Sequence, residues 1–296
     1  MSDLLNPESA NDDLTLGDVD KNLSTKGMSQ QAKYILFGAL AASALLIIII
    51  VIIIISASSN NKNKNLQKIG EINCIYSIES TSQPTQLINK NYKESDISII
   101  INGKEIKYSK QYKFDEIGSV NVQFVLYEAI NMDNMFQDIE ALTSVSLFSE
   151  KNAEITSMKG TFEGCTYLES FNISGFNTLK MKSISRLFYN CQSLEKINFG
   201  NINTENVEDM SYAFSNTQID YFNFENIQIN KLKNASHMFF ESVNIQKIDI
   251  ANLSSDSLED ISYMFSSCSS LEFIDINNLN TQNFKICLDY LLIAFF

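Results

Sequence analysis

The chain has 296 residues, with 35 acidic and 22 basic side chains, one histidine, no tryptophan and five cysteines. A net charge of −13 with a single arginine, Arg186, argues against nucleic-acid binding, because phosphate backbones are held mainly by clustered Lys and Arg. One histidine, His237, and five scattered cysteines supply too few ligands for a histidine-based catalytic site or a Cys/His zinc site. We therefore predict that the protein is not an enzyme and uses no cofactor or metal.

The amino-terminal part divides into a tail, an apolar segment and a linker. Residues 1–33 are acidic and lack apolar periodicity, which predicts a disordered cytosolic tail. Residues 34–57 are uncharged, and a helix of that length covers the roughly 30 Å hydrocarbon core of a bilayer. This run is too long and too far from the start for a cleaved signal peptide, so we predict a transmembrane signal-anchor helix. Residues 58–65 are rich in Ser, Asn and Lys and form a linker.

The orientation in the membrane is not set by charge, because three lysines lie close to each end of the apolar segment. Everything that can fold follows the segment, and Asn-X-Ser sequons for possible N-glycosylation occur there at Asn172, Asn234 and Asn252. We therefore predict a single-pass type II protein of the plasma membrane or another cell-surface membrane, with the folded part extracellular or lumenal.

Residues 66–131 alternate between apolar and polar side chains, as half-buried strands do. Strands are expected at 72–78, 97–101, 105–109 and 120–128, and Asn102-Gly103 is a type I′ hairpin signal. We expect a small β module that caps the open end of the segment that follows.

Six repeats follow, and their first residues lie 26, 26, 26, 25 and 26 residues apart. The repeats begin at Met132, Met158, Ile184, Met210, Ala235 and Ile261. Positions 1 and 5 of each repeat are apolar and position 8 is apolar or small, and these three positions lie on one face of a short helix. An L-x-x-I-x-I pattern follows, and its alternation predicts a strand. Because one such unit cannot bury its apolar side chains alone, we expect an α/β leucine-rich-repeat solenoid over 132–286.

Residues 287–296 continue the repeat only loosely and end on an apolar run. Either this run folds back over the last repeat, or the array is an incomplete version of a longer one; the missing polar cap favours the second interpretation.

The run Ile261-SYMFSSCSSLEFIDINNLNT resembles the repeats of BspA-like leucine-rich-repeat surface proteins. The likeness is most specific in the three copies that keep a cysteine at position 8, namely Cys165, Cys191 and Cys268. The resemblance implies a cell-surface protein, often adhesion-related or ligand-binding, and not an enzyme.

Cys165 and Cys191 occupy the same position in neighbouring repeats, close enough for a disulfide. A ladder of buried thiols is the alternative that we favour, because other copies hold small or apolar residues there. The acidic pairs Glu208-Asp209 and Glu259-Asp260 recur at one repeat position and are interpreted as solvated turn residues rather than as a calcium site.

The polar residues between the buried strand positions should line the concave face, on which solenoids usually bind. The predicted binding face consists of Ser170, Lys196, Asn198, Tyr221, Asn223, Lys247, Asp249, Phe273 and Asp275. We expect this face to bind an extracellular protein or glycan, in adhesion among other roles. The alternative is a structural cell-surface coat protein without a specific ligand.

Overall fold

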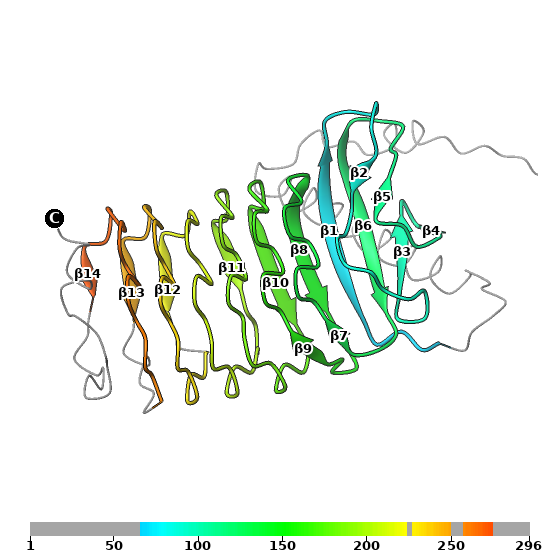
Figure 1. Ribbon diagram of the computed structural model, residues 1–296. Coiled ribbons are helices and arrows are strands. Elements are labelled where there is room, and N and C mark those ends of the chain that lie inside the picture. Colours follow the sequence, from blue (N-terminus) through cyan, green and yellow to red (C-terminus); the bar gives the residue numbers. More distant parts are fainter. Residues whose placement is uncertain (1–65, 224–226, 250–256, 275–296) are drawn as a thin grey trace, which may run out of the picture. The chain divides into compact units, whose positions relative to one another are not determined.

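The computed structural model describes residues 66–223, 227–249 and 257–274 (Figure 1). The chain divides into two units, residues 1–60 and 61–296, and every described residue belongs to the second. The predicted tail (1–33), signal-anchor helix (34–57), linker (58–65) and partial repeat (287–296) all lie outside the described residues. In the part of the chain that the structure does describe, no helix has the length and apolarity needed to cross a bilayer.

The described residues form fourteen strands and no helix, so the predicted α/β class is wrong and this part of the chain is all-β. Seven strands precede the first repeat strand: β1 (Gly70–Ile78), β2 (Thr85–Gln86), β3 (Ile97–Ile101), β4 (Lys104–Ile106), β5 (Gln111–Tyr112), β6 (Gly118–Leu126) and β7 (Ile130–Asn131). The repeats contribute β8 (Leu142–Phe148), β9 (Ile155–Ser157), β10 (Ser170–Ser174), β11 (Lys196–Asn198), β12 (Tyr221–Asn223), β13 (Lys247–Asp249) and β14 (Phe273–Ile274).

The segment predicted as a short helix in each repeat is a pair of consecutive tight turns. In the first repeat the Met135 amide donates to the Met132 carbonyl (3.0 Å) and the Ile139 amide to the Phe136 carbonyl (3.2 Å). Each turn spans four residues and has a left-handed third residue, as type II turns require. These left-handed residues stand at positions 3 and 7 of every repeat, with φ between 54° and 74°: Asn134, Asp138, Gly160, Gly164, Arg186, Asn190, Tyr212, Asn216, His237, Glu241, Tyr263 and Ser267.

Alternate amides of this segment bond to the next repeat instead of along a helix. The Asn134, Phe136 and Asp138 amides donate to carbonyls 25 residues later, at 3.0, 2.9 and 2.7 Å. With left-handed residues at positions 3 and 7, the amides of positions 3, 5 and 7 point along the stacking axis, where a neighbouring coil accepts them. The repeat is therefore a coil of turns and a strand, and stacking satisfies its backbone.

A ladder of phenylalanines at position 5 forms the centre of the repeat core. Consecutive rings in the first three repeats, Phe136, Phe162 and Phe188, lie parallel with centroids 5.5 and 5.6 Å apart. The ladder continues through Phe214, Phe239 and Phe265, and all six rings are buried. Aromatic rings bury large apolar areas, so this ladder is a main contributor to the stability of the stack.

One continuous sheet joins the amino-terminal module to the first repeats (Figure 1). Its strand order is β11-β10-β8-β1-β6-β3-β4. The repeat strands pair in parallel, whereas β1 pairs antiparallel with β8 on one side and with β6 on the other. β3 and β4 form a hairpin whose turn residues, Asn102 and Gly103, both have positive φ, as the sequence signal predicts. The module thus covers the edge that the first repeat strand would otherwise expose.

The cysteines at position 8 form the predicted thiol ladder and no disulfide; Cys165, Cys191 and Cys268 are all free and buried. Each thiol donates to the carbonyl of the position-5 phenylalanine in the preceding coil, at 3.0 Å. Ser242 occupies the same position and makes the same bond at 2.7 Å. A small buried donor at position 8 can therefore make this bond, and the sulfur itself is not essential.

These thiols predict a loss of stability at alkaline pH. Burial raises the pKa of Cys165 and of Cys268 from 9.0 to about 12. Between these two pKa values the unfolded chain loses protons that the folded chain keeps, so stability is full below pH 9 and falls as the pH rises above it.

Cys165→Ser keeps the hydrogen bond, as Ser242 shows, but removes one titrating group. Above pH 9 we expect the unfolding free energy of this variant to fall with a slope that is smaller than the parent's by about 1 kcal/mol per pH unit. Urea titrations between about pH 8 and 11 measure this, and equal slopes would contradict it.

Candidate binding face

The outward side chains of the strands form one surface, here called the strand face. Alternate residues of β8 and β10 are buried, and those between them point outward. On β11 the outward residues Lys196 and Asn198 are exposed. On β12 Tyr221 is 48% exposed, which is high for an aromatic side chain.

The register of the strands aligns the outward residues in columns at the 26-residue spacing. In the first sheet Ser144, Ser170 and Lys196 are paired in one column, and Ser146, Asn172 and Asn198 in the next. In the second sheet the register pairs Tyr221 with Lys247 and Lys247 with Phe273. The columns that the repeat spacing predicts are present within each sheet.

Hydrogen bonds between neighbouring coils order the polar side chains of these columns. The hydroxyl oxygens of Ser144 and Ser170 lie 2.8 Å apart, and the Asn172 amide nitrogen donates to the Ser146 hydroxyl oxygen at 3.1 Å. The Asn198 side-chain oxygen accepts the Gly200 backbone amide at 2.9 Å. These bonds fix the side chains and leave each with further donor or acceptor capacity toward the surface.

A groove of about 670 Å³ opens on the strand face where the two sheets meet. β11 and β12 belong to adjacent coils but to different sheets. The fourth repeat has one residue fewer than the third between its phenylalanine and the apolar residue before the strand. We attribute the break in strand pairing between β11 and β12 to this shorter segment before β12. Ile197, Phe199, Phe222 and the outward side chains of Lys196 and Tyr221 line the groove.

Not every predicted face residue can be placed at the level of its side chain. Asn223, Asp249 and Phe273 lie on β12, β13 and β14 at the expected register, and only their backbone is described. Asp275 lies outside the described residues. The prediction of a face that includes these four residues therefore rests on the sequence.

The three sequons differ in their surroundings. The Asn172 amide nitrogen is engaged on the strand face with Ser146, so a glycan there would disrupt the column. Asn234 lies in the segment before the fifth repeat, and its side-chain oxygen accepts the Ser236 amide at 2.9 Å. Asn252 lies outside the described residues.

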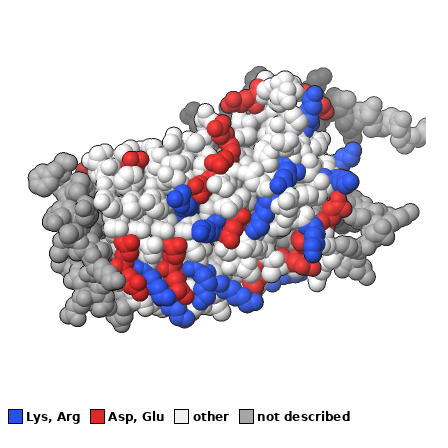
Figure 2. All heavy atoms as spheres, viewed as in Figure 1, with Lys and Arg blue, Asp and Glu red and all other residues white. Residues whose placement is uncertain are grey.

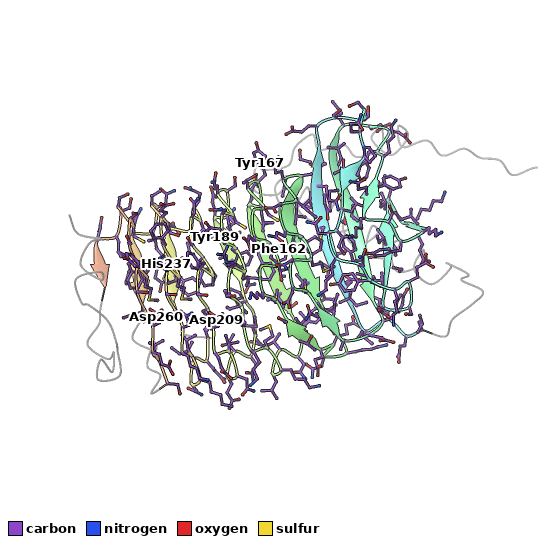
Figure 3. All side chains as sticks on the ribbon, viewed as in Figure 1. Phe162, Tyr167, Tyr189, Asp209, His237 and Asp260 are labelled. Atoms are coloured by element: carbon purple, nitrogen blue, oxygen red, sulfur yellow. The ribbon has the colours of Figure 1, made fainter. Side chains whose placement is uncertain are left out.

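Sequence reasoning missed a column of aromatic side chains on the opposite side of the coils, here called the turn face. Tyr212 stacks on His237 with ring centroids 4.4 Å apart, and His237 stacks on Tyr263 at 4.8 Å. The Arg186 guanidinium lies 5.0 and 5.2 Å from the Tyr189 and Tyr212 rings. Figure 3 labels Tyr189 and His237 on this column. The sequence signal is the recurrence of large planar side chains at position 3 from the third repeat onward, with Tyr189 and Phe240 at position 6 of the third and fifth repeats.

The only histidine is held inside this column. Burial lowers the pKa of His237, and the nearby Asp260 carboxylate partly offsets that effect. Its Nδ1 atom is buried and lacks a hydrogen-bond partner within the described structure. Its stacked neighbours explain its position in the column.

Charged side chains gather along the lower edge of the repeats, and further charged side chains of both signs cross the middle of the same view (Figure 2). Ion pairs join neighbouring coils: Lys180 with Glu154 at 2.9 Å, and Lys233 with Glu208 at 2.7 Å. Lys233 lowers the pKa of Glu208, which supports the interpretation of the Glu208-Asp209 pair as solvated turn residues. Within the residues that the structure describes, no three His, Cys, Asp or Glu side chains are grouped to hold a metal ion.

Residues 104–223 and 217–290 match the model of a family described as "Mycoplasma protein of unknown function, DUF285". The match covers more than half of the chain. The protein belongs to the DUF285 family. No curated protein and no solved structure matches the chain.

The DUF285 match begins at β4 and includes β6 and all six repeats. The columns of the strand face and the groove between β11 and β12 therefore fall within the matched ranges, as does the aromatic column. The two matched ranges overlap at residues 217–223, within the shorter fourth repeat at which the sheet is interrupted.

Proposed function

We propose that this DUF285 protein is a non-enzymatic cell-surface protein that binds an extracellular ligand through its strand face, in adhesion. The observation that carries the proposal is the groove between β11 and β12, which adjoins two columns of ordered polar side chains. An ordered polar surface next to a hollow suits binding, because its side chains lose little entropy when a partner arrives.

The surface location is supported by the sequence and by the resemblance of the repeats to BspA-like surface proteins. The uncharged segment 34–57 would hold the protein at a membrane, with the repeats on the outer side. Solenoids present large surfaces to partners, which suits a protein displayed in this way.

A binding role rather than catalysis is supported by the state of the reactive side chains. The thiolate is the nucleophilic form of cysteine, and burial raises the pKa of Cys74, Cys165, Cys191 and Cys268. These four thiols stay protonated near neutral pH and are covered by the core.

The binding role is tested by replacing Lys196, Tyr221, Lys247 and Phe273 together with alanine. Lys196 lies on β11, and the register of β12, β13 and β14 aligns Tyr221, Lys247 and Phe273. We expect adhesion of cells that display the protein to fall at least tenfold, since lost contacts of about 1 kcal/mol each sum beyond 1.4 kcal/mol. A matched control carries Val243→Ser, an exposed residue of the fifth repeat that lies outside the strands.

Surface display of both variants is verified by protease treatment of intact cells. Equal adhesion of the quadruple variant and the control, at equal display, would contradict the proposal and favour a coat protein that covers the cell without a specific ligand.

A further inference from the structure

The strand face does not end at the first repeat, and its chemistry indicates what it binds. We propose that the ligand is a neutral polysaccharide and that the binding surface extends across the amino-terminal module through β1 and β6. This inference rests on the proposed function and specifies both the partner and a part of the site that the repeats do not contain.

Two rows of outward residues cross five strands of the continuous sheet. Asn73 on β1 is paired with Gln123 on β6 and with Ser146 on β8, which begins the column of Asn172 and Asn198. The second row is Asn121, Ile75, Ser144, Ser170 and Lys196. The antiparallel β1–β8 pair thus aligns module residues with repeat residues, although they are not related by the 26-residue spacing.

Hydrogen bonds order the module part of the surface as they order the repeat part. The Gln123 amide nitrogen donates to the Asn73 side-chain oxygen at 3.1 Å and to a Glu71 carboxylate oxygen at 3.0 Å. The Asn73 amide nitrogen donates to the other Glu71 oxygen at 3.0 Å. Glu71 also forms an ion pair with Lys68, so its charge is compensated.

The two rows are almost uncharged on a protein with a net charge of −13. Their single charged member is Lys196, and the groove lining adds Glu195 beside it, so the two charges oppose each other. A surface without net charge gives no long-range attraction to an anionic or cationic partner. The two rows therefore offer a charged ligand no long-range attraction, which favours a neutral one.

The side-chain types favour a polysaccharide over a protein. Serine is depleted in protein interfaces, whereas Tyr and Arg dominate their strongest contacts. On this molecule Arg186 and the Tyr212 stack lie on the turn face. Hydroxyl and amide groups act as donor and acceptor at once, as sugar hydroxyls do. The strands lie about 4.8 Å apart, comparable to the length of one sugar ring, so successive units of an extended chain could meet successive strands.

Exposed apolar side chains complete the match. Ile75 lies within the second row and is 41% exposed, and Tyr221 lies at the far side of the groove. Both offer apolar contact to the C–H surfaces of a sugar ring while the neighbouring polar groups bond its hydroxyls.

The test is a pull-down of the detergent-solubilised full chain, so that its outcome does not depend on membrane orientation. The probes are beads of three neutral glucans (cellulose, β-1,3-glucan and dextran), beads of hyaluronan as the anionic polysaccharide, and beads coated with fibronectin. We expect retention on at least one neutral glucan that is nearly the same at low and high salt, because a neutral ligand has no charge whose attraction salt could screen. The double variant Asn73→Ala/Gln123→Ala should bind that glucan roughly tenfold more weakly, from two lost hydrogen bonds.

Val243→Ser is the control and should bind as the parent does. Ile75→Ser is a second variant for the module, because an exposed side chain can be changed with little effect on folding. Retention only on hyaluronan or only on fibronectin overturns the inference, as does failure to bind any neutral glucan. Glucan binding that is unchanged by both module variants also overturns it. If the quadruple alanine variant loses adhesion but the parent protein binds none of the glucans, the proposed function stands and only the assignment of a neutral polysaccharide as the ligand is wrong.

Discussion

Replacing Phe188 with alanine should lower the free energy of unfolding by about 3–5 kcal/mol. Its ring is fully buried, stacks on Phe162 at 5.6 Å and meets the edge of Phe171 at 5.1 Å. The side chain stands in the third of six repeats, so the cavity would lie between coils that depend on each other for burial. The vacancy cannot collapse without shortening the hydrogen bonds that hold the coils at their spacing.

The loss is measured by urea unfolding followed by circular dichroism, with the slope of the transition checked for a loss of cooperativity. Tyr167→Ala is the control, because this ring is 56% exposed and its removal should change stability by no more than about 0.5 kcal/mol. A loss below about 1 kcal/mol for Phe188→Ala would show that the phenylalanine ladder does not carry the stability assigned to it.

Gly175→Ala should destabilise the fold by about 3 kcal/mol or more, through backbone strain and a direct clash. Gly175 follows β10 with φ +73°, and an added Cβ would lie 1.9 Å from the Ser149 carbonyl oxygen. That oxygen belongs to the backbone of the preceding coil, and the adjacent Ser149 amide bonds to the Ser174 carbonyl at 3.1 Å. The methyl group could be accommodated only if the two coils moved apart.

Gly118→Ala separates the two contributions. Gly118 has φ +119°, and no atom lies within 4 Å of an added Cβ, so only the backbone strain applies there. We expect the Gly175 variant to lose at least about 1 kcal/mol more than the Gly118 variant in the same urea titration. Equal losses would mean that the coils can separate at this point without a penalty.

The repeat spacing was enough to predict the strands and their register. The column of Ser144, Ser170 and Lys196 follows from the spacing, because equivalent residues of stacked coils must pair. The predicted helix was wrong because apolar residues at positions 1, 5 and 8 are shared by a helix and by two consecutive type II turns. The distinguishing signal was available in Gly160, Gly164 and the asparagines at position 7, since such residues tolerate left-handed backbone.

Two features of the site could not be predicted from the repeat. The groove lies beside the fourth repeat, which is one residue shorter, and the sequence shows this difference without showing that the sheet is interrupted there. The contribution of Asn73 and Gln123 depends on an antiparallel pairing between distant segments, for which the 26-residue period gives no signal. The same limit applies to the stack of Tyr212, His237 and Tyr263, because the left-handed backbone that aligns these rings was not expected.

Protease treatment of intact cells tests most directly the claim that the solenoid is displayed outside to bind a partner. With an antibody tag at each end, we expect added protease to remove the carboxyl-terminal tag and to leave the amino-terminal tag intact, while both are lost once the membrane is permeabilised. Survival of the carboxyl-terminal tag on intact cells together with loss of the amino-terminal one would contradict the account, because the strand face could then meet no extracellular ligand.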